Sequence, residues 1–279
     1  IEVIDDCSSD GDLESLVKDV GKGRVKYFRQ EKNVGSLRNF ETCLNRSRGI
    51  FIHILHGDDK VREGFYQEIE ELFNENPEAG AAFTDFSLID KNSVESIKRD
   101  EVKIERGVVK DFLLKIAEQQ LIQPPAIVVK RSVYEQLGGF YAVHFGEDWE
   151  MWARISSRFP MAYSPKRLAC YRVGQSIGVS YESFLKGQNI KDIRKVINII
   201  QTYLPTEHRK EIKKKALSYY SMYSIKVANS LLESNRKAAV RQVKNAYLMS
   251  PDLKTTFWLC RFFLMYLLRY KELKRMYDN

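Results

Sequence analysis

Short apolar runs alternate with amphipathic segments over the first 86 residues of the chain. The apolar runs, which are typical of strands, occupy residues 2–5, 25–28, 50–55 and 79–86. The segments with helical spacing of apolar residues occupy residues 12–20, 36–45 and 63–74. Because strand and helix alternate, we predict an α/β fold with a mostly parallel sheet flanked by helices.

The pattern becomes less regular after residue 86 and then wholly helical. Helices are predicted over residues 108–117 and 147–157, and short strands over residues 126–129 and 168–173. From Tyr181 onward only helical spacing is present, with breaks near Pro205, Asn235 and Pro251. We therefore predict two domains, an α/β domain over residues 1–180 and a helical region over residues 181–279.

Charge divides along the same boundary. Residues 1–180 carry a formal net charge of −4, whereas residues 181–279 carry +12. A basic region of this kind fits an anionic partner, which can be nucleic acid or anionic lipid. No other feature supports nucleic acid, so we expect none to bind.

The ends and the cysteines add two expectations. Strand-like residues begin at Ile1 itself, so we expect the first strand of this domain to precede the chain given. The cysteines, Cys7, Cys43, Cys170 and Cys260, show no metal-ligand spacing and no disulfide framework. A reducing, cytoplasmic setting is therefore expected.

Carboxylates follow two of the predicted strands. Asp5 and Asp6 end the first, and Asp58 and Asp59 follow the strand at residues 50–55. Ligands of parallel sheets bind at the carboxyl ends of the strands, so both pairs are expected at one crevice. Mg²⁺ is commonly held by one or two carboxylates together with substrate phosphates. The plainer interpretations are a helix N-cap for the first pair and a polar turn for the second.

Two further segments carry candidate chemistry. Gly35 and Arg38 stand at a predicted helix start, where an Arg can reach a diphosphate, although a plain turn with a surface Arg is the simpler alternative. Glu147, Asp148 and Trp149 also open a predicted helix. Acids at a helix N-terminus are electrostatically favourable for structural reasons alone, but beside aromatic residues they also suit a dry sugar-binding site.

In order and spacing, six motifs resemble those of glycosyltransferase family 2, whose members have the GT-A fold. They are Asp5-Asp6-Cys7-Ser8, Asn33 to Asn39, His56 to Asp59, Arg131 to Phe140, Glu147-Asp148 and Tyr171-Arg172. The resemblance covers about residues 1–180. It implies a Rossmann-like domain that binds a nucleotide diphosphate-sugar.

The resemblance also implies a role for each site residue. The residues implied to contact the nucleotide are Asp5, Asp6, Arg38 and Asp58. The residues implied to bind the metal, Mg²⁺ or Mn²⁺, are Asp58 and Asp59. Catalysis falls to Asp148 as general base with Glu147 beside it, and contacts with acceptor or sugar to Trp149 and Arg172. One base and no second nucleophile correspond to transfer with inversion at the anomeric carbon.

Departures and alternatives accompany this hypothesis. The family's metal motif usually begins with Asp, whereas His56 stands there in this chain. A nucleotidyltransferase and a non-catalytic sugar-nucleotide-binding relative are the alternatives. The Glu147-Asp148-Trp149 segment argues against the former, and the retained Asp58, Asp59 and Asp148 argue against the latter.

The acceptor is expected to be a glycan or a lipid-linked sugar, in bacterial cell-surface polysaccharide or O-antigen assembly. An apolar stretch at residues 256–268 has basic neighbours, Lys254 before it and Arg269, Lys271, Lys274 and Arg275 after it. It is too short to span a bilayer, which needs about 20 apolar residues. It fits peripheral binding at the inner face of the cytoplasmic membrane. The alternative is that its apolar face packs on the preceding helices.

Overall fold

The computed structural model describes residues 1–97, 104–174 and 178–267, and the chain divides into two compact units. The sheet unit consists of residues 1–110, 122–144 and 158–173. The helical unit consists of residues 111–121, 145–157 and 174–279. Each unit is made of three separate segments of the chain. The division into consecutive domains, residues 1–180 and 181–279, stays a prediction.

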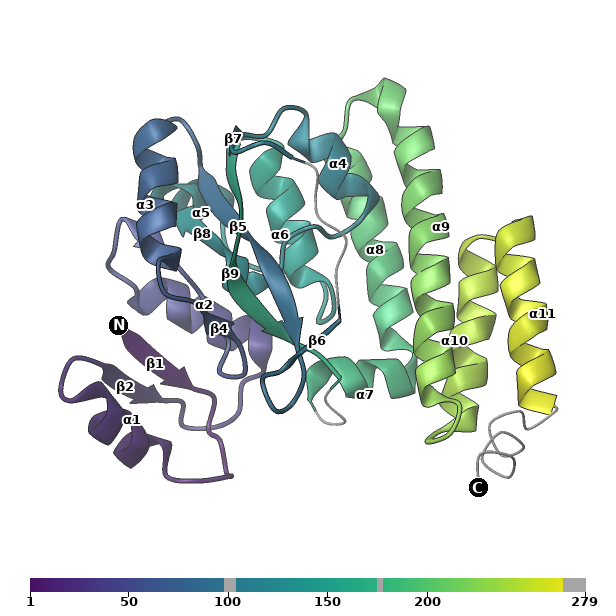
Figure 1. The fold of residues 1–279 in the computed structure, drawn as a ribbon, viewed down its shortest axis with the longest axis horizontal. Helices are drawn as coiled ribbons and strands as arrows, with labels where there is room; N and C mark the ends of the chain where they lie inside the picture. The colour runs from purple at the N-terminus through teal and green to yellow at the C-terminus, as the bar shows by residue number, and fades with distance from the viewer. Residues whose placement is uncertain (98–103, 175–177, 268–279) are drawn as a thin grey trace. The chain divides into compact units, whose positions relative to one another are not determined.

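The strands of the sheet unit form two sheets. Their bounds are β1 (Glu2–Asp5), β2 (Lys26–Arg29), β3 (Phe51–Ile52), β4 (Lys60–Val61), β5 (Ala81–Ile89), β6 (Glu95–Ile97), β7 (Gly107–Val108), β8 (Ile127–Lys130) and β9 (Met161–Arg172). β1 pairs with β2, and the larger sheet has the order β3-β8-β5-β9-β4, with β6 on β5 and β7 on β9. The long strands β5 and β9 lie side by side at its centre (Figure 1).

Strand directions correct one part of the prediction. Only β1–β2 and β5–β9 are parallel among the described pairs, and the other five are antiparallel. Alternation of strand and helix fixes the direction of successive strands but not which strands become neighbours. β8 lies between β3 and β5 and runs opposite to both, so antiparallel pairs enter a sheet that was predicted to be mostly parallel.

Three of the four described helices of the sheet unit match amphipathic segments of the sequence, and the fourth, at residues 131–137, was not predicted. The four are α1 (Leu13–Gly21), α2 (Ser36–Arg46), α3 (Phe65–Glu75) and α5 (Arg131–Leu137), with a 3₁₀ turn at Pro124–Ala126. α3 packs on β5 and β9 and buries Phe65, Ile69, Leu72 and Phe73. Full burial of one such side chain stabilises the fold by about 1.5–3 kcal/mol.

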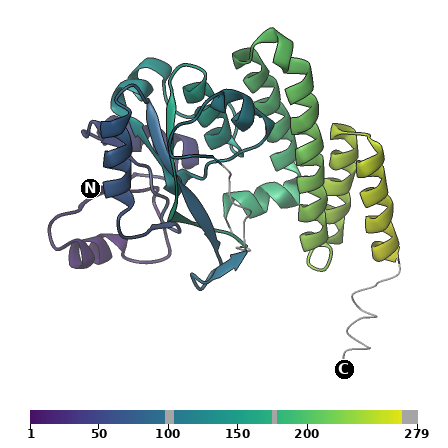
Figure 2. The same cartoon turned by 45° about the horizontal axis from the view of Figure 1, so that its top comes forward.

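The helical unit contains α4, α6 and the whole C-terminal series. Its helices are α4 (Phe112–Glu118), α6 (Glu147–Ser156), α7 (Val179–Lys186), α8 (Gln188–Tyr203), α9 (Thr206–Leu231), α10 (Arg236–Met249) and α11 (Leu253–Leu267). The predicted breaks near Pro205, Asn235 and Pro251 are confirmed, and the Asn235 side chain caps α10 by accepting from the Ala238 N–H. α8, α9, α10 and α11 lie side by side in both views (Figures 1 and 2).

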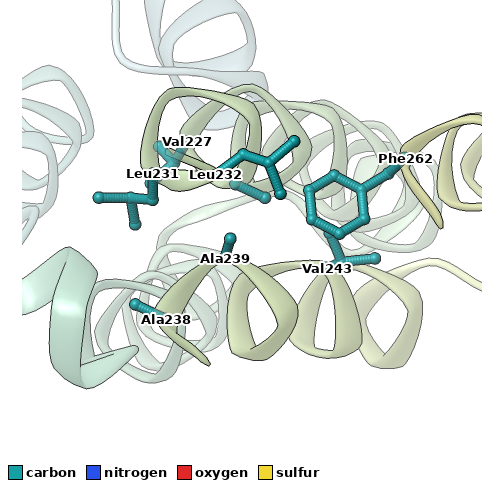
Figure 3. Close-up of a cluster of buried hydrophobic side chains, with 8 residues drawn as sticks. Val227, Leu231, Leu232, Ala238, Ala239, Val243 and Phe262 are labelled. Carbon is teal, nitrogen blue, oxygen red and sulfur yellow. The ribbon is translucent and has the colours of Figure 1, made fainter. Parts of the chain in front are cut away.

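A small apolar cluster joins the last three helices. Its buried members lie on α9 and its C-cap Leu232, on α10 and on α11, and they are Val227, Ala228, Leu231, Leu232, Ala238, Ala239, Val243 and Phe262, all but Ala228 labelled in Figure 3. Alanines on α10 leave room for the larger side chains opposite, and among the buried residues that the structure describes Phe262 is the one member contributed by α11. Among the helices that the structure describes, none is long and apolar enough to cross a membrane.

Candidate active site

A cluster of possible metal ligands follows β3 in the sheet unit. His56, Asp58 and Asp59 each offer one ligand atom, and these atoms lie within 4.8 Å of one another. The Asp59 side chain is 1% exposed, its Oδ1 accepts the Arg172 N–H at 2.8 Å, and its Oδ2 has no hydrogen-bond partner among the described residues. An orphaned, buried carboxylate oxygen is costly and is usually satisfied by a cation or water. The residues present therefore fit a divalent metal ion.

Electrostatics at this cluster agree with that assignment. Burial raises the pKa of Asp59 to about 7, against the Arg172 hydrogen bond that lowers it. Burial also lowers the pKa of His56, against the Asp58 charge that raises it, so the imidazole is neutral at neutral pH. The His56 ring stacks on Phe40, with centroids 5.1 Å apart and planes 4° apart. A fixed, neutral imidazole beside carboxylates is a ready metal ligand.

Arg172 braces the turn that holds these acids. It lies at the end of β9, where its Nε donates to the Asp58 carbonyl at 2.8 Å and its Nη1 to the Asp90 carbonyl. Its Nη2 donates to Ser93 Oγ at 3.0 Å. The guanidinium is thus engaged by the protein itself, and the expected contact with acceptor or sugar stays a prediction.

The acid pair at the end of β1 is also bound within the protein. Asp5 is buried and accepts from Tyr27 Oη and Arg29 Nη1, each at 2.7 Å, and from the Ser8 N–H at 2.9 Å. Burial raises the pKa of Asp5, but the hydrogen bonds from Ser8 and Tyr27 and the charge of Arg29 outweigh it, so the pKa lies below its usual value. These bonds tie β1 to β2.

Asp6 organises the turn before α2. Its carboxylate accepts the N–H groups of Val34 at 2.7 Å and Gly35 at 2.9 Å, and its carbonyl accepts from Asn33 Nδ2 at 3.0 Å. Gly35 has a φ of 83°, which favours glycine, and begins α2. Arg38 follows in the first turn with an exposed side chain. The nucleotide contacts expected of Asp5, Asp6 and Arg38 stay predictions.

The predicted general base lies in the helical unit, at the N-terminus of α6. Asp148 Oδ1 accepts the Trp149 N–H at 2.7 Å, and Oδ2 accepts from Gln120 Nε2 at 2.5 Å. Burial raises the pKa of Asp148 against these bonds, and burial together with the Asp148 charge raises the pKa of Glu147. Two adjacent acids with raised pKa values are a pattern that functional sites share.

Trp149 packs inside the helical unit. Its ring is fully buried in the helical unit, donates from Nε1 to the Ile116 carbonyl at 2.6 Å, and lies 4.8 Å from the Tyr220 ring. This packing fixes the start of α6, and the contact with acceptor or sugar expected of Trp149 stays a prediction. Gln120 was missed because it follows α4, 28 residues before Asp148, without any sequence signal.

Comparison with known proteins agrees with this geometry. Residues 1–138 match the sequence model of glycosyl transferase family 2. An uncharacterized Mycobacterium tuberculosis protein is 25% identical over 193 residues, which is 62% of this chain and 57% of the relative, so the chain spans little more than half of that protein.

Solved structures show the same fold at low identity. TarS residues 1–349 of S. aureus, in complex with UDP-GlcNAc, match with a TM-score of 0.63 and 14% identity over 88% of this chain and 69% of that one. The mannosyltransferase PcManGT of Pyrobaculum calidifontis, in complex with GDP-Man and Mn²⁺, matches with a TM-score of 0.52 and 15% identity over 100% and 78%. The predicted resemblance is therefore confirmed: residues 1–138 match glycosyl transferase family 2, and the chain has the GT-A fold.

Proposed function

We propose that this glycosyltransferase moves a sugar from a nucleoside diphosphate donor to an acceptor hydroxyl, with inversion at the anomeric carbon. The observation that carries the proposal is Asp148, an acid of raised pKa held at a helix start by Gln120 and a backbone N–H. Similar structures that bind UDP-GlcNAc or GDP-Man support a donor of this class. A non-catalytic relative would have no need of such an acid.

The reaction balances with one protein base. The acceptor oxygen attacks the anomeric carbon while its proton passes to Asp148, and a new C–O bond forms. The bond between that carbon and the diphosphate oxygen breaks, and its electron pair leaves with the nucleoside diphosphate. Inversion follows from this single displacement, because retention through a covalent intermediate requires a second, well-placed nucleophile.

The sheet unit supplies the groups that suit the donor. His56, Asp58 and Asp59 would hold a divalent ion, which supplies positive charge to the departing diphosphate when bound. Arg172 keeps Asp58 and Asp59 in place through its backbone N–H and its guanidinium. The neighbour solved with Mn²⁺ supports an ion of this kind.

We further propose that the acceptor is a glycan or lipid-linked sugar of cell-surface polysaccharide assembly, reached from the inner membrane face. An exposed apolar stripe on α11 supports this location. Leu253, Phe257, Leu264 and Leu267 are 91%, 64%, 58% and 75% exposed, at the spacing of one helix face. α11 contains no acid, and exposed Lys254 and Arg261 flank the stripe. Such a surface suits the headgroup region of an anionic bilayer.

The alternative prediction, that this apolar face packs on the preceding helices, holds only for the opposite side of α11. There Thr255 and Phe262 are buried. The four expected basic residues at positions 269, 271, 274 and 275 lie outside the described residues.

The proposed reaction is tested with Asp148→Asn, which keeps the size of the side chain but cannot accept the proton. Release of nucleoside diphosphate is measured over a panel of sugar nucleotides with a glycan acceptor, and NMR gives the anomeric configuration of the product. We expect unchanged donor binding and a loss of transfer of about 10²–10⁴-fold. Asp19→Asn, the same change at an exposed position on α1, is the control. Wild-type rates for Asp148→Asn, or a retained configuration, would refute the mechanism.

A further inference from the structure

The ligand set at the end of β3 contains one nitrogen. His56 occupies the position where related motifs carry an acid, and its ring nitrogen is grouped with oxygens of Asp58 and Asp59. Mg²⁺ prefers oxygen ligands, whereas imidazole suits transition ions. We propose that His56 coordinates the metal directly and that the site therefore selects a divalent transition ion over Mg²⁺. The proposal rests on the proposed function, since it specifies the ion of that same site.

Distances favour coordination over a hydrogen bond. His56 Nδ1 lies 4.0 Å from Asp59 Oδ2, which is too long for an N–H···O bond. Two ligands of one ion, each about 2.1–2.2 Å from it, can be at most about 4.3 Å apart. The 4.0 Å separation falls inside that limit, so one ion can bind both atoms with little movement of either side chain.

Burial supplies an independent observation. Asp59 is 8% exposed as a residue, and Oδ2, the oxygen nearest His56 Nδ1, is the one without a hydrogen-bond partner among the described residues. The other oxygen is already satisfied by the Arg172 N–H. The unpartnered oxygen of Asp59 therefore lies near the imidazole nitrogen, at a distance that one metal ion can bridge. A purely structural role for His56 does not explain why this buried oxygen has no partner.

The ring of His56 is also held in orientation. Phe40 stacks on it with planes 4° apart, and Phe40 in turn contacts Phe140 at 5.3 Å between centroids. A ligand held by its neighbours loses little rotamer freedom on binding, so less free energy is spent on ordering it. The third ligand, Asp58, is exposed, so its side chain can adjust its position when a metal ion binds.

The experiment uses the whole chain, stripped of metal, and Mn²⁺ alone as probe. Pulsed EPR detects ¹⁴N coupled to bound Mn²⁺, and titration gives the Mn²⁺ affinity, with Mg²⁺ measured by competition. We expect ¹⁴N coupling in the wild type and its loss in His56→Asp. We expect the Mn²⁺ preference over Mg²⁺ to fall by about tenfold or more in that variant, because all ligands are then oxygens.

Controls separate this proposal from the proposed function. His144→Asp makes the same change at an exposed histidine and should leave the coupling intact. If His56→Asp folds poorly, His56→Gln serves in its place, because it replaces the imidazole with a neutral side chain. Bound Mn²⁺ without ¹⁴N coupling, an unchanged Mn²⁺/Mg²⁺ ratio in both variants, or no Mn²⁺ binding would overturn the role of His56. Transfer activity measured in parallel tests the glycosyltransferase independently of these outcomes.

Discussion

Replacing Gln120 by Leu removes one hydrogen bond to the proposed base and nearly preserves side-chain volume. In the native chain Gln120 Nε2 donates to Asp148 Oδ2 at 2.5 Å. Burial raises the pKa of Asp148, whereas this bond and the Trp149 N–H favour the carboxylate and lower it. Without the Gln120 bond, fewer hydrogen bonds oppose the effect of burial, so the pKa of Asp148 should rise further.

The size of the rise can be worked from the strength of the lost bond. A hydrogen bond to a charged group contributes about 1.5–3 kcal/mol. One pKa unit corresponds to about 1.4 kcal/mol, so the pKa of Asp148 should rise by about 1–2 units. The base acts in its deprotonated form, so the acidic limb of the kcat/KM profile should move to higher pH by the same amount. Well above the limb, most of the activity should remain.

The assay is a pH–rate profile of transfer for the wild type and Gln120→Leu. Gln119→Leu makes the same change one residue earlier, at the C-cap of α4, and serves as the control. Thermal melting of each variant separates a changed pKa from a damaged fold. An unmoved limb in Gln120→Leu, or an equal shift in Gln119→Leu, would refute the reasoning that Gln120 tunes the base.

Three other outcomes are expected. Asp59→Ala should weaken nucleoside diphosphate binding only when Mn²⁺ or Mg²⁺ is present, which calorimetry with and without chelator measures. Burial raises the pKa of Glu68, but hydrogen bonds from Lys166 and Arg106 outweigh it and lower the pKa to about 2. Glu68→Gln should therefore lower the free energy of unfolding by about 3 kcal/mol at pH 7. Urea unfolding should show this cost fading as pH falls below about 4.5 toward 2, since Glu68 then becomes protonated. Leu264→Asp should reduce sedimentation with anionic vesicles about tenfold while Val20→Asp, also exposed, does not, and equal binding by both would exclude the α11 stripe.

Local patterns carried most of the fold. The helices at Leu13–Gly21, Ser36–Arg46 and Glu147–Ser156 begin and end within two residues of the predicted limits, because apolar spacing and turn residues act over short distances. Strand neighbours could not be predicted in this way. The position of β8 between β3 and β5 depends on packing between distant segments, which no local pattern records.

The site was predicted to the extent that its residues are adjacent in sequence. Asp58 and Asp59 follow one strand and were predicted as metal ligands, and the structure groups their ligand atoms with that of His56, which the sequence marked only as a departure from the family's motif. Gln120 could not be found, because its partner Asp148 lies 28 residues further along the chain and Gln has no spacing signature. The burial of the Trp149 ring could not be predicted, because an aromatic residue beside an acid looks the same in sequence whether its ring is buried or exposed.

Acidic residues of this chain separate into two groups by their surroundings. Asp5 and Glu68 are buried with cationic and hydroxyl or amide partners, and their pKa values lie below the usual range, so they stabilise the fold as carboxylates. Asp59, Glu147 and Asp148 are less well compensated, and burial raises their pKa values. Such acids destabilise the fold, so their presence is best explained by a function, either binding a metal ion or accepting a proton. On this criterion Asp5 stabilises the β1–β2 pair, and Asp59, Glu147 and Asp148 are the acids that we propose for the chemistry.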